Sequence, residues 1–314
     1  MNLDNLKIKF RHLQTFVEVA RQKSVVQAAK VLNVSQPAVT KTIREMEEAL
    51  GVTVFEREGR GLRLTRSGEV FLRHAGTTLA SLKRGMDAVS TTGFGDTMPL
   101  RIGALPTVAS NIMPRAMTLF LAENAGGQVK IVTGENAVLM EQLRLGDLDL
   151  VVGRLAAPEK MAGLSFEHLY SEQVVFAVRT GHPLLEAKQA LFGTLGDFPI
   201  LMPTRGSIIR PVVEQFLITH GITDLPVQIE TVSDTFGRAF VQTSDAIWII
   251  SHGVVAADIA HGLLATLPID TAETKGPVGL TLKAEACVPA PLDILMQTIR
   301  QAARDIAGAA GKRD

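Results

Sequence analysis

Apolar residues recur at helical spacing in three successive segments near the start of the chain. They are Leu13, Phe16, Val17 and Ala20 in the first segment, Ala28, Ala29 and Leu32 in the second, and Val39, Ile43, Met46 and Leu50 in the third. This spacing places each set on one face of a helix, and Gly51 ends the third helix. Residues 52–55 and 62–65 then alternate around a glycine-rich turn, which predicts a β-hairpin. Three helices and a hairpin in this order predict a winged helix-turn-helix.

The third helix presents polar side chains away from its apolar face. Ser35 is expected to cap this helix, and Pro37 is tolerated in its first turn, where the backbone amides have no intrahelical partner. The other candidates for DNA contact are Gln36, Thr40, Lys41 and Arg44 on the helix and Arg57, Arg60 and Arg63 in the hairpin. Amide and hydroxyl groups can read base edges, whereas cations suit phosphates or the minor groove. A solvated helix face and a basic loop are the ordinary alternative, but the complete order of elements favours DNA recognition.

A longer helical pattern follows the hairpin, from about residue 67 to residue 89. Its apolar positions are Phe71, Ala75, Leu79, Leu82, Met86 and Val89, with a spacing typical of a coiled coil. Packing against the same chain is one explanation of this stripe. We favour a dimer contact, because a lone helix would otherwise expose the stripe to water. Residues 91–96 then predict a flexible joint.

From residue 99 onward, short apolar strands alternate with helical segments. Strands are predicted at 100–104, 129–133, 148–152, 174–178, 200–202, 227–231, 246–250 and 279–283, and helices at 109–121, 137–145, 208–220, 235–242 and 292–306. Repeated units of this kind predict an α/β fold of mostly parallel sheets with helices on both faces. The units form two groups, and the end of the chain returns toward the first. This organisation indicates two lobes with a ligand cleft between them.

These patterns divide the chain into parts of different charge. Residues 8–66 form the predicted winged helix-turn-helix, residues 67–95 the linker and dimerisation helix with its hinge, and residues 96–314 the effector-binding domain, with lobe I at about 96–167 and 269–314 and lobe II at about 168–268. The net charge is zero, but residues 1–90 contain 15 Lys and Arg against 9 Asp and Glu, and the rest contains 17 against 23. A basic N-terminal part on an acidic body suits a domain that meets phosphate.

Several functional classes find no support in the sequence. Cys287 is the single cysteine, which excludes an internal disulfide and a multi-cysteine metal site and fits a reducing cytoplasm. The seven histidines show no metal-ligand spacing, and the chain has neither a phosphate-binding loop nor a nucleophile elbow. The N-terminus lacks the apolar segment of a signal peptide, and no apolar run reaches the roughly 18 residues that a membrane helix requires. We therefore expect a cytoplasmic protein that is not an enzyme, binds no metal or cofactor and does not contact a membrane.

Candidate effector contacts lie where predicted strands lead into helices. They are Leu105, Thr107, Glu135, Asn136, Thr204, Arg205 and Ser207, with Ser233 as a weaker candidate. Free backbone amides at a helix start form an anion site, and the guanidinium of Arg205 suits a carboxylate. A single Thr or Ser at such a position more often only caps the helix. Junctions from both lobes together favour a small carboxylate ligand, which Glu135 would repel unless its side chain points away.

The N-terminal motifs closely resemble those of LysR-type transcriptional regulators. The matching residues are Ala28, Ala29, Leu32, Ser35–Thr40, Ile43, Glu47, Leu50, Gly51, Phe55–Arg57, Leu64, Thr65 and Gly68, and the resemblance extends over the whole chain. It implies a periplasmic-binding-protein-like effector domain, in which the effector lies between the lobes and Thr107 supplies a pocket hydroxyl. It also implies a homo-oligomer, a dimer or a tetramer, on an interrupted inverted repeat of double-stranded DNA in a promoter. Effector binding would then allow contact with RNA polymerase.

Four further segments of the chain point to a particular subgroup of this family. Residues 8–16, 132–137, 153–158 and 245–251 are similar to family members that activate operons for protocatechuate degradation. This similarity implies that the inducer is 3-carboxy-cis,cis-muconate, a tricarboxylate. A regulator that responds to another small organic acid or to a sugar-linked signal is the main alternative. The competing class is a ligand-binding module or an enzyme whose N-terminal domain serves only for dimerisation.

Overall fold

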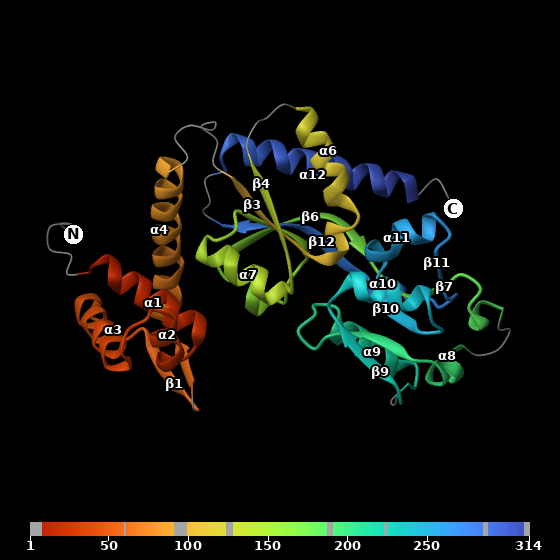
Figure 1. The fold of residues 1–314 in the computed structure, drawn as a ribbon, viewed down its shortest axis with the longest axis horizontal. Helices are drawn as coiled ribbons and strands as arrows, with labels where there is room; N and C mark the ends of the chain where they lie inside the picture. The colour runs from red at the N-terminus through yellow and green to blue at the C-terminus, as the bar shows by residue number, and fades with distance from the viewer. Residues whose placement is uncertain are drawn as a thin grey trace. The chain divides into compact units, whose positions relative to one another are not determined.

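The computed structural model describes residues 8–59, 61–90, 99–123, 128–186, 191–222, 225–284 and 288–310. The chain divides into two compact units, an N-terminal unit that ends at Met98 and a larger unit that begins at Pro99. Figure 1 shows the elements of both units. In the described ranges, no helix is long and apolar enough to cross a membrane, and no group of His, Cys, Asp and Glu side chains could hold a metal ion.

The N-terminal unit consists of helices and a short hairpin. Its elements are α1 (Phe10–Gln22), α2 (Val25–Val31), α3 (Gln36–Leu50), β1 (Phe55–Glu58), β2 (Gly61–Leu64) and α4 (Arg66–Ser90). Strands β1 and β2 pair in antiparallel register, as expected for the wing of a winged helix-turn-helix. The wing begins at Phe55 rather than at residue 52, and the backbone amide of Val54, just before it, donates to the Glu47 carboxylate at 2.8 Å.

The predicted cap and stop of α3 are present, and α2 begins with a cap of the same kind. The Ser24 hydroxyl accepts a hydrogen bond from the Gln27 amide, and the Ser35 hydroxyl accepts one from the Ala38 amide, each at 3.4 Å. These bonds satisfy amides that have no partner within their own helix. Gly51 closes α3 in the left-handed region, with φ of 71°, where a residue without Cβ is favoured. The caps therefore fix where α3 starts and stops.

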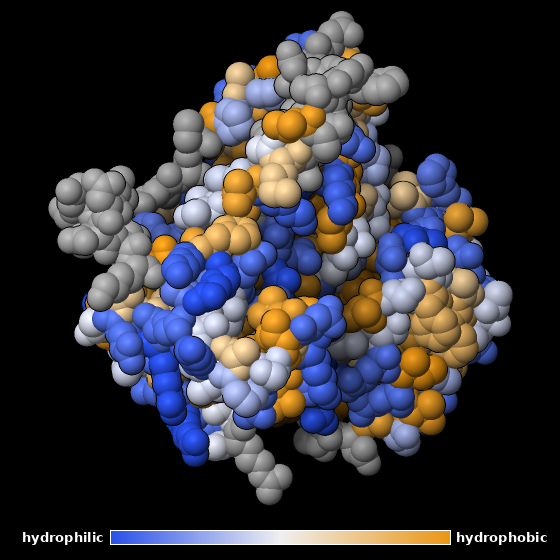
Figure 2. Space-filling model, turned by 60° about the vertical axis from the view of Figure 1, so that its left-hand side comes forward, coloured by the Kyte–Doolittle hydropathy of each residue, from blue (hydrophilic) through white to orange (hydrophobic). Residues whose placement is uncertain are grey.

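The core of this unit is built around Phe16, which is fully buried in α1. Its ring centroid lies 5.3 Å from that of Phe55 and 5.2 Å from that of Phe71, so the ring joins the first helix, the wing and α4. The first part of the α4 stripe thus packs against its own chain. Farther along α4, Met86 and Val89 are 65% and 73% exposed. Hydrophobic residues also remain on the surface in several patches among hydrophilic ones (Figure 2).

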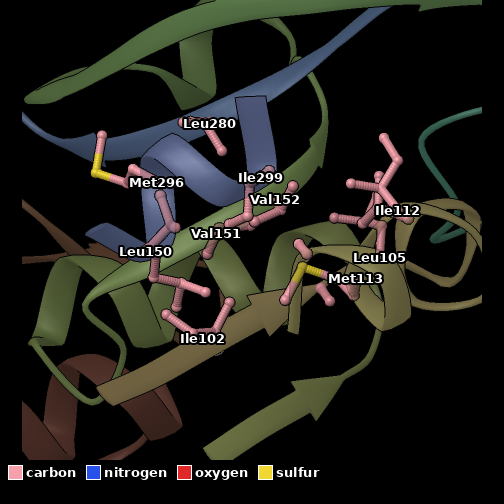
Figure 3. Packing of buried hydrophobic residues seen from close by; sticks show 14 of the residues in the cluster. Ile102, Leu105, Ile112, Met113, Leu150, Val151, Val152, Leu280, Met296 and Ile299 are labelled. Atoms are coloured by element: carbon pink, nitrogen blue, oxygen red, sulfur yellow. The ribbon is translucent and has the colours of Figure 1, made fainter. Parts of the chain in front are cut away.

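Lobe I of the larger unit is a five-stranded sheet with the order β4-β3-β5-β12-β6. Its elements are β3 (Leu100–Ala104), α5 (Pro106–Ala109), α6 (Ile112–Ala122), β4 (Val129–Thr133), α7 (Asn136–Leu145), β5 (Leu150–Arg154), η2 (Pro158–Lys160), β6 (Leu164–Glu172), β12 (Gly276–Lys283) and α12 (Ala290–Ala310). Helices α6 and α12 pack against each other (Figure 1). Figure 3 shows part of the core, where Leu150 and Val152 of the sheet gather with Met113 of α6 and Ile299 of α12.

Lobe II is a second five-stranded sheet with the order β11-β7-β10-β8-β9. Its elements are β7 (Val174–Arg179), η3 (Pro183–Leu185), α8 (Leu191–Thr194), η4 (Leu195–Asp197), β8 (Ile200–Pro203), α9 (Arg210–Thr219), β9 (Gln228–Thr231), α10 (Asp234–Gln242), β10 (Ile247–Ser251), α11 (His252–Ala260), β11 (Leu264–Thr266) and η5 (Ala272–Thr274). In both lobes, three parallel strands are extended by antiparallel ones, so the sheets are mixed.

The structure differs from the sequence prediction mainly at β6, β11 and α11, which were not predicted. Strand β6 runs to Glu172, past the lobe boundary expected after residue 167, and the chain enters lobe II directly afterwards with β7. It returns between β11 and β12. Strand β6 lies at a sheet edge and carries many polar residues, β11 has three residues, and α11 is apolar around most of its circumference. Each of these properties weakens the periodic signal.

Gly68 provides a test of the packing between α4 and the segment before the wing. A Cβ atom at Gly68 would lie 2.1 Å from the Val54 carbonyl oxygen, whereas one at Gly85, in the same helix, would meet nothing within 4 Å. Gly68→Ala should therefore destabilise the protein by about 1–3 kcal/mol through overpacking. Gly85→Ala should stabilise it by about 0.4–1 kcal/mol, because alanine restricts the unfolded chain. Calorimetric melting of both variants checks this, and equal shifts would contradict the close approach.

Candidate DNA and effector sites

The predicted DNA-reading side chains lie together on the exposed face of α3. A groove of about 660 Å³ is lined by Gln36, Pro37, Thr40, Lys41, Arg44, Glu45 and Glu48. Ser35 precedes them as the exposed helix cap, while Val39 and Met46 are buried on the opposite face. The Thr40 hydroxyl donates to the Gln36 carbonyl oxygen at 3.1 Å, which leaves its oxygen free to accept. This face combines the amide, hydroxyl and cationic groups that a major-groove contact uses.

Glu45 was not among the predicted site residues, yet its carboxylate holds several of the nearby cations. It lies 3.1 Å from Nη2 of Arg11 and 3.9 Å from Nζ of Lys41, and Nε2 of His12 is 3.4 Å away. Partial desolvation raises the pKa of Glu45, but the His12 hydrogen bond and the charges of Arg11 and Lys41 outweigh it, so the pKa lies below its ordinary value. Glu45 therefore remains charged and partly neutralises the recognition helix.

The arginines of the wing point in different directions. The strand register places Glu56 opposite Arg63 and Arg57 opposite Leu62, so Arg57 and Arg63 lie on opposite faces of the hairpin. Nη2 of Arg63 bonds Oε1 of Glu56 at 2.6 Å. Both arginines are exposed, and the carboxylate beside Arg63 competes with a phosphate for its guanidinium. Arg60 lies outside the described residues.

In the larger unit, Thr107 meets a carboxylate of its own chain. Thr107 is buried at the start of α5, and its hydroxyl donates to Oε2 of Glu172, the last residue of β6. The other oxygen, Oε1, accepts a hydrogen bond from the Gly253 amide of α11 at 2.5 Å. Glu172 thus joins a helix start in lobe I to a helix start in lobe II. Neither Glu172 nor Gly253 was predicted as a site residue.

A buried arginine lies next to this carboxylate. Nη2 of Arg154 donates to the backbone oxygen of Glu172, and Nη1 donates to that of Thr274 at 3.3 Å. The Asn136 amide is also occupied, because it donates to the Arg154 carbonyl oxygen at 3.2 Å. Among the described residues, Nε of Arg154 and the hydroxyl of Tyr170 have no hydrogen-bond partner.

The charged side chains of this cluster, Glu172 and Arg154, are buried away from solvent. Burial raises the pKa of Glu172, and the hydrogen bonds from Thr107 and Gly253 together with the charge of Arg154 only partly offset the effect. Burial also raises the pKa of the Tyr170 hydroxyl, in the same direction as the nearby charge of Glu172. The Glu172 carboxylate therefore occupies its position at a desolvation cost.

A second carboxylate of lobe I reaches across to lobe II. Oε1 of Glu135, before α7, accepts a hydrogen bond from the Thr204 hydroxyl at 3.0 Å. A Cβ atom at Gly206 would lie 2.4 Å from Oε2 of Glu135, so this carboxylate packs directly on the loop after β8. The Ser110 hydroxyl lies 3.3 Å from Oδ2 of Asp234 in a third such contact. Glu135 thus points toward lobe II, where it engages a predicted ligand donor.

The remaining candidates do not gather into one site. The Ser233 hydroxyl accepts a hydrogen bond from the Phe236 amide at 3.1 Å and so caps α10. Capping is the more common role of a serine at such a position. Leu105 is buried, with its amide bonded to Val152. The Ser207 amide donates to the Thr204 carbonyl oxygen within a turn, and Arg205 is exposed. Of the predicted effector residues, Glu135 and Thr204 therefore form a contact between the lobes, and Thr107 bonds the Glu172 carboxylate that also binds Gly253 of lobe II.

Both units match known protein families. Residues 10–69 match the model of a bacterial regulatory helix-turn-helix protein of the lysR family, and residues 95–304 match that of the LysR substrate binding domain. The chain is 66% identical over 300 residues to the HTH-type transcriptional regulator PcaQ of Agrobacterium fabrum, with 96% of each chain covered.

Solved structures share the arrangement of the elements. Full-length OxyR from Pseudomonas aeruginosa has a TM-score of 0.58 at 22% identity, with 93% of this chain and 97% of that chain covered. Full-length CbnR in complex with its target DNA has a TM-score of 0.54 at 24% identity, with 94% and 100% covered. At these identities the likeness shows the fold.

The position of Glu45 leads to a prediction about DNA affinity. Glu45→Gln should raise the affinity for all DNA by about two- to fivefold at low salt, because Lys41 and Arg11 lose a competing carboxylate and phosphates lose a repulsive charge. Fluorescence anisotropy with operator and unrelated duplexes measures the change. Glu123→Gln alters the net charge equally at an exposed position of the larger unit and should have no such effect. A gain confined to one sequence would contradict a purely electrostatic role.

Proposed function

The chain belongs to the LysR family of bacterial transcriptional regulators, and we propose that it activates protocatechuate-degradation genes when it binds a small carboxylate inducer. The 66% identity to PcaQ over 96% of the chain carries this proposal. Resemblance to regulators of that type implies 3-carboxy-cis,cis-muconate as the inducer. The protein acts by binding rather than by catalysis, in the cytoplasm, where promoters are found.

The DNA contact follows from the arrangement of α3 and the wing. Gln36 and Thr40 read base edges in the major groove, and Lys41 and Arg44 contact the adjacent phosphates. The wing arginines Arg57, Arg60 and Arg63 add phosphate or minor-groove contacts. Because these cations neutralise phosphates and release their condensed counterions, affinity is expected to fall steeply with salt.

The chain functions as a homo-oligomer on an interrupted inverted repeat. The exposed apolar residues Leu82, Met86 and Val89 on the second half of α4 supply a surface that a second copy can cover, and two such dimers form a tetramer. Effector binding between the lobes changes the spacing of the DNA-binding pairs, relaxes a bend in the DNA and allows contact with RNA polymerase. The effector can do this only if it binds one arrangement more tightly than the other.

The effector site combines donors from both lobes. Thr107 and the Gly253 amide lie together at one junction, and Thr204 with the exposed Arg205 lies at another. A tricarboxylate needs several such donors, because each charge that leaves water must be compensated. Another small organic acid that uses the same donors is the alternative inducer.

Gln36 tests the assignment of α3 as the base-reading element. Gln36→Ala should weaken binding to the operator by about 1–3 kcal/mol and relax the base preference, since one bidentate base contact contributes roughly that much discrimination. Binding to unrelated DNA should change little, because Gln36 carries no charge. Selection of bound sequences from a random pool, for the wild type and the variant, measures the preference. An unchanged preference would remove Gln36 from base recognition.

Thr107 tests the effector site. Thr107→Val keeps the shape of the side chain but removes the buried hydroxyl, at a cost of about 1–3 kcal/mol in stability. Operator binding should persist, while the response to the inducer is lost. In a thermal-shift assay, 3-carboxy-cis,cis-muconate at a hundred times its dissociation constant should add about 2.7 kcal/mol to the wild type and little to the variant.

Ser233→Ala is the matched control for the loss of stability. It removes the cap of α10 at a cost of about 1 kcal/mol, without touching the Thr107 junction. The variant should retain the full shift with the inducer. A normal response of Thr107→Val would place the effector elsewhere, and no shift with any of the protocatechuate-derived acids would withdraw the protocatechuate assignment.

A further inference from the structure

The carboxylate of Glu172 rests on donors of the kind that a ligand carboxylate would use. The Thr107 hydroxyl and the Gly253 amide hold its two oxygens, and Glu172 is only 6% exposed. The Gly253 amide belongs to the first turn of α11, a helix of nine residues, where backbone amides carry partial positive charge. A hydroxyl beside such an amide is a donor set for one carboxylate.

These donors cannot serve two carboxylates at once. A Cβ atom at Gly253 would lie 2.5 Å from Oε1 of Glu172 and 3.0 Å from the Thr107 hydroxyl oxygen, so no space remains between the three groups. A second carboxylate at this distance would also be repelled by the charge of Glu172. An anionic ligand that uses Thr107 must therefore move Glu172 away.

We propose that Glu172 is an internal ligand, which occupies the donors of Thr107 and Gly253 in the free protein and which a carboxylate of the effector displaces. The proposal rests on the function proposed above, because it requires the effector to bind at Thr107. Displacement of Glu172 then breaks a direct bond between lobe I and α11 of lobe II. Effector binding is thereby coupled to the contact between the lobes.

Within the described part of the chain, two buried hydrogen-bond donors close to Glu172 in the fold are unused in the free protein. Nε of Arg154 is buried without a partner among the described residues, although the same guanidinium binds the Glu172 backbone oxygen through Nη2. The hydroxyl of Tyr170, on the same strand as Glu172, has no partner either. A carboxylate that leaves Thr107 and Gly253 can gain donors here that are unused in the free protein. The exchange replaces hydrogen bonds rather than abandoning them.

Burial raises the pKa of Glu172, and the hydrogen bonds from Thr107 and Gly253 with the charge of Arg154 offset this effect only in part. This direction agrees with a carboxylate that an anionic ligand can displace. The contact between Glu135 and Thr204 repeats the same arrangement at the other junction, where a carboxylate of the chain occupies a hydroxyl suited to the effector. In the free protein, the carboxylates of Glu172 and Glu135 thus occupy the positions in which the proposal expects the carboxylates of the ligand.

Replacement of Glu172 by its neutral counterpart tests the proposal. Glu172→Gln preserves the shape of the side chain but removes the charge that competes with the effector, and hydrogen bonds to a charged acceptor are about twice as strong as neutral ones. Isothermal titration of the full chain with 3-carboxy-cis,cis-muconate should show binding about tenfold tighter than in the wild type, a change of about 1.4 kcal/mol. Glu172→Asp, which cannot span both donors, should change the affinity in the same direction.

Glu167→Gln is the matched control, because Glu167 lies on the same strand as Glu172 and pairs with Arg300 on α12. This variant should bind 3-carboxy-cis,cis-muconate with the affinity of the wild type. If Thr107→Val abolishes binding while both Glu172 variants bind no more tightly than the wild type, the inference is wrong and the effector site stands. If Thr107→Val binds normally, or no variant binds the probe, the effector site and the inference both fail. A gain in Glu167→Gln equal to that in Glu172→Gln would also overturn the inference, because it would assign the effect to charge on the lobe as a whole.

Discussion

The buried guanidinium of Arg154 ties together the two segments through which the chain passes between the lobes. It donates to the backbone oxygen of Glu172, where the chain leaves lobe I, and to that of Thr274, where it returns. The Thr274 hydroxyl in turn accepts from the Val174 amide at 2.9 Å. A charge buried in this way is costly unless its bonds are made, so these hydrogen bonds keep the two crossing segments next to each other. The donors of both lobes are positioned relative to this crossing.

The sequence predicted those features of the fold that depend on residues close together in the chain, such as helix ends and short buried strands. Ser35 and Gly51 mark the ends of the recognition helix because a cap depends on residues next to it in the chain. The strands at 100–104 and 129–133 were predicted with the observed bounds, since both are short runs rich in β-branched and other apolar residues between turn signals. Strand β6 was missed because an edge strand buries only part of its surface, and its Ser, Glu and His residues obscure the apolar pattern.

The two candidate sites differ in the same way, because one depends on local periodicity and the other on contacts between distant segments. The face formed by Gln36, Thr40 and Lys41 follows from helical periodicity alone. In contrast, Glu172 meets Thr107 only because β12 pairs with β5 and β6, which brings Glu172 and Arg154 to opposite sides of one strand. Register between distant strands leaves no mark in a single sequence. The effect of Glu135 was predicted as a possible repulsion, but its hydrogen bond to Thr204 depends on the contact between lobes.

In both candidate sites, carboxylates of the chain contact the groups that are proposed to bind the ligand. On the DNA-binding unit, Lys41 and Arg63 are held by Glu45 and Glu56, and in the effector domain the hydroxyl of Thr107 is held by Glu172. In the proposed function, binding at either site exchanges an internal carboxylate for a phosphate or an effector carboxylate, and only the difference between the old and the new partner contributes to affinity. Phosphate and a multiply charged acid can win such an exchange, whereas a neutral molecule of the same shape leaves the internal carboxylates in place. In the proposed function, the acidic residues beside each site thus favour strongly anionic ligands over weakly charged ones, and in the DNA-binding unit they act together with the local excess of Lys and Arg in residues 1–90.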